Sequence, residues 1–234
     1  MSKKWNKSSR THAQEVPYAL EIQPRQESIK PFIPRTTTQK LYANAMLNYK
    51  IVVGLGPPGT GKSYVALAVA ADRLKAGEID RIIITRPIVE AGESLGFLPG
   101  EEQEKVAPYM RPMLEILNER LGKSFAGYLI KTGQIAFEPL AYLRGRTFND
   151  AVVVLDEAQN TSKSQMKMFL SRMGRNCTMV VDGDIDQQDT SGLSGLQDMA
   201  NRLKHISSIC FVKFEIGDIV RDPLVKEIIL AYRN

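Results

Sequence analysis

The residues best suited to chemistry lie in the octapeptide Gly56–Ser63, which reads GPPGTGKS. Its spacing fits G-x-x-x-x-G-K-[ST], in which glycines let the backbone curve into a nest whose N–H groups point at phosphate oxygens. Lys62 adds a charge that can reach the β- and γ-phosphates of a nucleotide, and Ser63 offers a hydroxyl to Mg²⁺. The following helix aims the positive end of its dipole at the same anion. The predicted nucleotide-contacting residues are therefore Gly56, Pro57, Pro58, Gly59, Thr60, Gly61, Lys62 and Ser63.

The segments on both sides of the octapeptide favour this interpretation. Ile51–Leu55 is a short apolar, β-branched run, as expected of a buried strand. After the octapeptide, apolar side chains recur at i, i+3, i+4 and i+7, which predicts one face of a helix that stops near Gly77 (Leu67, Ala70, Ala71 and Leu74). The alternative is a Gly-Pro turn that happens to contain Lys-Ser, and the flanking strand and helix argue against it.

A second chemical pair follows the apolar run Ala151–Leu155. Apolar residues followed by Asp at the end of a strand form a Walker B motif. Asp156 is expected to hold Mg²⁺ together with Ser63, and Glu157 is the natural general base for the water that attacks the γ-phosphate. Plain surface polarity is the alternative, and the preceding phosphate loop makes it the weaker one.

Two glutamines are candidates for nucleotide recognition. Gln187 lies in GDIDQ, after the expected strand Thr178–Val181, where polar groups face a ligand at the carboxyl ends of parallel strands. We expect it to sense the γ-phosphate and orient water. A calcium loop is rejected because Gln187 and Leu193 stand where that loop needs Gly and Glu. Gln39, 17 residues before Gly56, can read adenine through its amide. The absence of Asn-Lys-x-Asp also favours ATP over GTP.

The remaining pattern alternates strands and helices, which predicts βαβ units in a three-layer α/β sandwich with a mostly parallel sheet. The expected strands are Ile51–Leu55, Arg81–Thr85, a short one at Gln134–Phe137, Ala151–Leu155, Thr178–Val181 and Ile209–Phe214.

Three helices can be placed around these strands. One is capped by Thr37 or Thr38. A second carries an apolar stripe from Val106 to Leu121 that Pro108 and Pro112 kink or split, and a third contains Met166–Met173 and ends at Gly174. Residues 1–35 form a basic, proline-containing arm, and residues 36–234 form the domain.

Charge and composition exclude several classes of protein. The net charge is +5, and residues 1–10 supply +4 of it, which leaves +1 for the rest. This tail either binds nucleic acid or simply solubilises the chain. No apolar run reaches the roughly 18–20 residues that cross a bilayer, and none follows the basic start as in a secretory signal. The isolated pairs Cys177/Cys210 and His12/His205 indicate a cytoplasmic protein without a zinc site.

Three arginines are further candidates for phosphate contact. Arg144 and Arg146 lie in YLRGRTF before the Walker B strand, and Arg221 lies in GDIVRDP after the last strand. Each can contact either ATP or a nucleic-acid backbone, and a solvated surface position is the alternative.

The chain resembles the PhoH family through GPPGTGKS, TRPIVEAGESLGFLPG, LRGRTF, VVLDEAQNTS, QMKMFLSRMG, GDIDQQD and DIVRDPLV, in this order. The resemblance implies a domain like the first RecA-like domain of superfamily 1 helicases, with Thr178–Val181 between the P-loop and Walker B strands. It implies that Gln39 contacts adenine, that Arg86 and its loop face nucleic acid, and that a hexameric ring holds ATP at its subunit interfaces. The chain is similar to compact, phage-type members that have no PIN or KH domain.

The leading interpretation is an oligomeric Mg²⁺-dependent ATPase that acts on single-stranded RNA or DNA as a helicase-like motor, with RNA expected. Arg221 of a neighbouring subunit is expected to supply the arginine finger, because the chain has one RecA-like domain. A phosphotransferase is a second class, disfavoured by Glu157 directly after Asp156. A nucleotide-gated regulatory ATPase without unwinding activity is the third.

Overall fold

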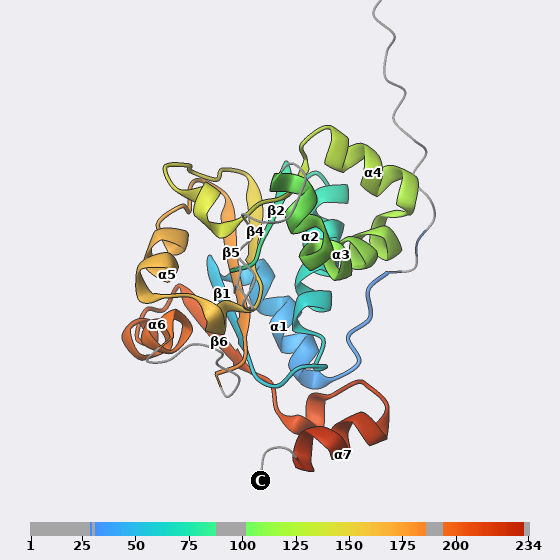
Figure 1. Ribbon diagram of the computed structural model, residues 1–234, viewed down its shortest axis with the longest axis vertical. Helices are drawn as coiled ribbons and strands as arrows, with labels where there is room; N and C mark the ends of the chain where they lie inside the picture. The colour runs from blue at the N-terminus through green and yellow to red at the C-terminus, as the bar shows by residue number, and fades with distance from the viewer. Residues whose placement is uncertain (1–28, 30, 88–101, 186–193, 232–234) are drawn as a thin grey trace, which may run out of the picture.

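The computed structural model describes residues 29, 31–87, 102–185 and 194–231. Its centre is a sheet of six strands in which every neighbouring pair is parallel (Figure 1). Across the sheet the strands run β3 (Ile135–Phe137), β2 (Arg81–Thr85), β4 (Ala151–Leu155), β5 (Cys177–Gly183), β1 (Ile51–Leu55) and β6 (Ile209–Lys213). This order confirms that the strand after the Walker B strand inserts between it and the P-loop strand.

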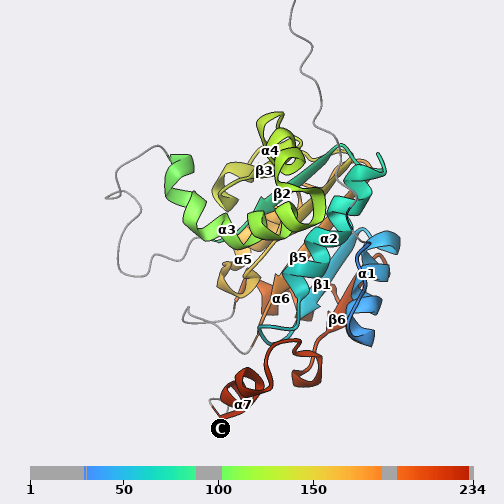
Figure 2. The same ribbon diagram turned by 90° about the vertical axis from the view of Figure 1, so that its right-hand side faces the viewer.

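Helices cover both faces of the sheet, which makes three layers (Figures 1 and 2). One layer holds α1 (Thr37–Asn48), α2 (Lys62–Lys75), α3 (Glu102–Leu121) and α4 (Lys123–Lys131). The other holds η2 (Leu140–Leu143), α5 (Lys163–Leu170) and α6 (Gly195–Leu203). Two short turns, η3 (Ala158–Asn160) and η4 (Ile216–Asp218), complete the body, and α7 (Pro223–Ala231) projects from it. The three-layer α/β prediction is therefore confirmed.

The two apolar cores explain why the central strands are hydrophobic on both sides. Every residue of β4 and β5 is buried, since alternate side chains enter opposite cores. On β4, for example, Val152 packs in the core under α2 and Val153 in the core under α5. A polar side chain on these strands therefore reaches the surface only at the strand ends, and elsewhere it is buried.

Two helix boundaries differ from the sequence-based expectation. Thr36, and not Thr37 or Thr38, caps α1, because its hydroxyl accepts a hydrogen bond from the backbone N–H of Gln39 at 3.1 Å. The helix α3 runs unbroken through Pro108 and Pro112. Its last three turns are held against the sheet by buried apolar side chains, and this packing outweighs the helix hydrogen bonds that proline removes (Met113, Leu117 and Leu121).

The helix α5 also ends earlier than expected, at Leu170 and not at Gly174. The chain then turns back, and Met173 pairs with Phe148 in an isolated parallel bridge. A Cβ atom at position 174 would lie 2.6 Å from the carbonyl oxygen of Phe148. Glycine is therefore required here for a close approach of two backbones, and it does not act as a helix cap.

Within the described ranges, no helix combines the length and the hydropathy needed to cross a membrane.

Replacing Phe169 by alanine tests the packing of α5. Its side chain is fully buried against the sheet, so Phe169→Ala should lower the free energy of unfolding by roughly 3–5 kcal/mol. Leu224→Ala removes an exposed leucine on α7 and should stay within about 0.5 kcal/mol. Urea unfolding of both variants measures the effect. Equal losses in the two variants would show that α5 does not pack as described.

Candidate functional site

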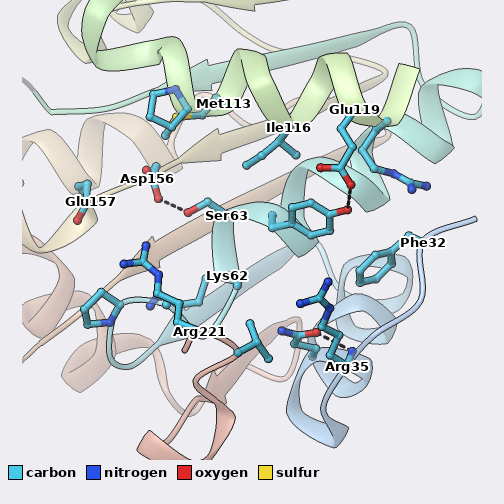
Figure 3. Close-up of a pocket in the computed structure, with 18 of the residues that line it drawn as sticks. Phe32, Arg35, Lys62, Ser63, Met113, Ile116, Glu119, Asp156, Glu157 and Arg221 are labelled. Carbon is cyan, nitrogen blue, oxygen red and sulfur yellow. Dashed lines mark hydrogen bonds between the residues drawn. The ribbon is translucent and has the colours of Figure 1, made fainter. Parts of the chain in front are cut away.

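The octapeptide links β1 to α2, and its last two residues begin α2. It lies at the carboxyl ends of the parallel strands. Gly56, Gly59 and Gly61 all have positive φ, at 141°, 81° and 85°, which confirms that these positions need glycine. The loop borders a pocket of about 920 Å³ (Figure 3). Within the loop, Thr60 is buried and donates a hydrogen bond from Oγ1 to the carbonyl of Pro57 at 2.9 Å.

Lys62 is folded back over its own loop. Its Nζ donates to the carbonyl oxygens of Gly56 at 2.6 Å and Pro57 at 2.9 Å. Burial lowers the pKa of the Lys62 ammonium, while Asp182, Asp184 and other nearby carboxylates raise it. The ammonium thus sits beside the pocket with carbonyl partners that phosphate oxygens can replace.

Ser63 and Asp156 meet although they come from different elements. The Ser63 hydroxyl donates to Asp156 Oδ1 at 2.8 Å, and the Asp156 carboxylate is buried. In the described part of the chain, no group of three or more His, Cys, Asp or Glu side chains is placed to hold a metal. A hydroxyl and one carboxylate beside a phosphate loop suit Mg²⁺, which takes few protein ligands and completes its shell with phosphate oxygens and water.

Glu157 is held in an unusual conformation directly after this aspartate. Its φ of 53° is left-handed, which is uncommon for a residue with a side chain. Its Oε2 accepts a hydrogen bond from Gln159 Nε2 at 2.7 Å, and Gln159 Oε1 accepts one from the backbone N–H of Asp184 at 3.1 Å. Gln159 therefore ties the end of β4 to the end of β5. Gln159 was not among the predicted site residues, although a glutamine two residues after the candidate base was a visible signal.

Gln39 lines the pocket from the start of α1 and is buried. Its Nε2 donates to the carbonyl of Thr60 at 2.9 Å, and its Oε1 accepts from the backbone N–H of Arg35 at 2.8 Å. These two bonds leave the amide one N–H and one oxygen lone pair. Gln39 thus supports the loop and keeps a donor and an acceptor of the kind that adenine needs. Gln187 lies outside the described residues.

Among the candidate arginines, Arg221 lies beside the loop. Arg221 lines the pocket on the same chain, and its Cδ and Nε would lie 3.0 and 3.1 Å from a Cβ at Gly59 (Figure 3). The backbone N–H of Val220 also bonds the Gly59 carbonyl at 3.0 Å. The chain's own C-terminal segment therefore brings Arg221 to the loop of the same chain, and an arginine finger from Arg221 of a neighbouring subunit stays a prediction.

The other arginines are placed differently from one another. Arg86, which the resemblance assigned to a nucleic-acid-facing segment, lines the same pocket and pairs with Asp156. Arg144 is exposed outside the pocket. Arg146 forms an ion pair with Glu138 and lies 5.0 Å from the centre of the Phe148 ring.

A buried acid beneath the loop was not foreseen. Asp182 on β5 has no exposed surface, and the Tyr42 hydroxyl of α1 donates to its Oδ1 at 2.5 Å. Burial raises the pKa of Asp182 to about 7, and the neighbouring Asp156 acts in the same direction. The signal in the sequence was a single aspartate inside the apolar strand TMVVDG.

The strand order, the phosphate loop after β1 and the Asp-Glu pair after β4 together define a P-loop NTPase-type domain of the RecA-like class. The family model described as PhoH-like protein matches residues 31–233, and the chain belongs to this family.

Curated relatives match over most of this chain. The chain is 50% identical to a PhoH-like protein of Bacillus subtilis over 85% of its own length, and 43% identical to Protein PhoH of Escherichia coli K12 over 86%. It spans 63% and 58% of those two proteins. Among solved structures, a SWI2/SNF2 ATPase core of Sulfolobus solfataricus in complex with dsDNA aligns with a TM-score of 0.43 and 15% identity, over 78% of this chain and 36% of that chain.

Asp182 gives the stability of the chain a specific dependence on pH. Its pKa is about 7 in the folded chain, against an ordinary value of 3.8. Between these pH values the folded chain keeps a proton that the unfolded chain releases, so this group makes the folded state less stable as pH rises. Asp182→Asn lacks the group, and its stability relative to the parent chain should grow from pH 4 to 7 and then level off.

Urea unfolding at several pH values measures this difference. Asp80→Asn, at an exposed aspartate before β2, controls for the substitution itself. A difference between Asp182→Asn and the parent chain that stays constant from pH 4 to 8 would contradict the buried, protonated aspartate.

Proposed function

We propose that this protein is a Mg²⁺-dependent ATPase that works as an oligomeric, helicase-like motor on single-stranded nucleic acid, with RNA as the expected substrate. The observation that carries the ATPase proposal is the convergence of Lys62, Ser63, Asp156 and Glu157 on one pocket from two separate segments of the chain, the start of α2 and the end of β4. Each has a distinct task in phosphoryl transfer: the Lys62 ammonium lies on the carbonyls of the phosphate loop, and the Ser63 hydroxyl meets Asp156 at 2.8 Å.

The chemistry follows from the positions of these side chains. Lys62 exchanges its carbonyl partners for the β- and γ-phosphates, while Ser63 and Asp156 hold Mg²⁺, which when bound neutralises phosphate charge. Glu157, oriented by Gln159, accepts a proton from the attacking water. The new oxygen–phosphorus bond forms as the bond between the γ-phosphorus and the bridging oxygen breaks, which releases ADP and phosphate.

Adenine recognition is assigned to Gln39. The remaining N–H and lone pair of its amide match the donor and acceptor of an adenine edge. Because the same amide bonds the Thr60 carbonyl, a base contact there can also change the position of the phosphate loop.

The proposed partners are a second copy of the chain in a hexameric ring and a strand of RNA or DNA. Nucleic-acid binding is supported by the resemblance to the PhoH family, by the charge of +4 on residues 1–10 and by the exposed position of Arg144. The ring is supported by the family resemblance alone. We propose a cytoplasmic location, with residues 36–234 as the ATPase domain and 1–35 as an arm.

A regulatory ATPase without unwinding activity is the second candidate. The observation that favours it is that Arg221 reaches the loop of its own chain, so the pocket gains its additional cation without a ring. ATP hydrolysis measured with and without single-stranded RNA separates the two candidates. Strong stimulation supports the motor, and unchanged hydrolysis supports the regulator.

Two substitutions separate phosphate binding from hydrolysis. Lys62→Ala should abolish tight ATP binding because it removes the ammonium at the phosphates. Glu157→Gln should keep ATP affinity within about threefold and slow turnover by ~10²-fold or more, since only the proton acceptor is lost. Nucleotide titration and phosphate release measure both effects. Normal turnover in Glu157→Gln would remove Glu157 from the role of base.

Gln39→Ala tests whether Gln39 recognises adenine. It should weaken ATP more than GTP, by about 1–3 kcal/mol if both contacts to adenine are lost. Thr36→Ala is the matched control, because it removes the cap of the same helix and leaves the side-chain amide of Gln39 unchanged. Competition binding with both nucleotides measures the ratio. The same loss for ATP and GTP in Gln39→Ala would refute the assignment and leave Gln39 as a support of the loop.

A further inference from the structure

Arg86 lines the pocket, and the proposed reaction gives it no task. It directly follows β2, and its side chain is 22% exposed. Its Nη2 donates to Asp156 Oδ2 at 2.5 Å, and its Nε donates to the same oxygen at 3.2 Å. The same Nη2 lies 3.7 Å from Glu157 Oε1. One guanidinium therefore bridges the proposed metal ligand and the proposed base.

This pairing leaves the Asp156 carboxylate engaged at both oxygens, with Ser63 at Oδ1 and Arg86 at Oδ2. A divalent cation at this carboxylate would lie beside the guanidinium, and two cations that share one oxygen repel each other. Arg86 and Mg²⁺ are thus competitors for Asp156.

An Arg86 side chain that leaves Asp156 stays in the pocket, because its Nη2 also lies within ion-pair distance of Glu157. The guanidinium already lies beside Glu157, which serves the water next to the γ-phosphate. The oxygens of a γ-phosphate at this place would therefore lie within reach of the guanidinium. ADP has no γ-phosphate and offers Arg86 no such partner.

We propose that Arg86 yields Asp156 to Mg²⁺ when ATP binds and then contacts the γ-phosphate, so that it makes the site prefer ATP over ADP. This inference rests on the proposed ATPase function. The Nη2 of Arg86 also lies 4.0 Å from the sulfur of Met113 on α3. A movement of Arg86 would therefore change its contact with this helix, which lines the pocket.

The competition with metal can be tested without nucleotide. Mn²⁺, which is visible by electron paramagnetic resonance, is titrated into the parent chain and into Arg86→Gln. The variant should bind Mn²⁺ at least about tenfold more tightly, since the charge-assisted contacts of Arg86 to Asp156 are gone. Arg111→Ala, which removes an exposed arginine on α3, should behave like the parent chain. The same Mn²⁺ affinity in Arg86→Gln and the parent chain would overturn the competition.

The γ-phosphate contact is tested by comparing ADP with a non-hydrolysable ATP analogue at saturating Mg²⁺. In Arg86→Gln the preference for the ATP analogue over ADP should fall at least about tenfold, mainly through weaker binding of the analogue. An unchanged preference would overturn the contact. If the parent chain binds neither nucleotide, the proposed function is refuted. The Mn²⁺ titration would still decide whether Arg86 and the metal compete for Asp156.

Arg86→Lys covers the case in which Arg86→Gln does not fold, as judged by thermal unfolding. Lysine keeps the positive charge but cannot donate two N–H groups in the fixed geometry of a guanidinium. Arg86→Lys should therefore change the Mn²⁺ affinity and the preference for the ATP analogue over ADP in the same directions as Arg86→Gln, but by smaller factors. Parent-like values for both measurements in Arg86→Lys, with Arg86→Gln unfolded, would contradict the proposal.

Discussion

The rest of the structure depends on balancing negative charge at the ends of β4 and β5. Asp156, Glu157, Asp182 and Asp184 all lie there, and three of them are buried. Lys62 approaches this group from the phosphate loop. Three of these carboxylates are stabilised in different ways: Asp156 is neutralised by Arg86, Glu157 is half-exposed and bonded by Gln159, and Asp182 keeps its proton near neutral pH. A polyphosphate can enter such a site only with additional cations, which is the physical reason to expect Mg²⁺.

The phosphate loop is clamped from both ends of the described chain. Gln39 on α1 bonds the Thr60 carbonyl, and Val220 after β6 bonds the Gly59 carbonyl. Phe214 also donates its backbone N–H to Leu55 at 2.6 Å, where the loop begins. Segments far apart in the sequence thus fix one loop of eight residues. A nucleotide that moves this loop would consequently move α1 and the segment that leads to α7.

Much of this arrangement could be predicted from the sequence, because it rests on local patterns. The apolar runs before Gly56 and Asp156 predicted β1 and β4, and parallel strands must bring the groups at their ends together. Helix boundaries were harder, since packing outweighed the two prolines in α3 and a close backbone approach explained Gly174. The partners of Arg86, Tyr42 and Gln159 could not be predicted, because they depend on side-chain directions that no spacing encodes.

The central claim is that this charge-balanced site hydrolyses ATP with the help of Mg²⁺. The most direct test measures phosphate release from ATP by the purified chain, once with Mg²⁺ and once with EDTA, with single-stranded RNA present in both. The account predicts steady release with Mg²⁺ and none with EDTA. No release with Mg²⁺, or equal release under both conditions, would contradict it.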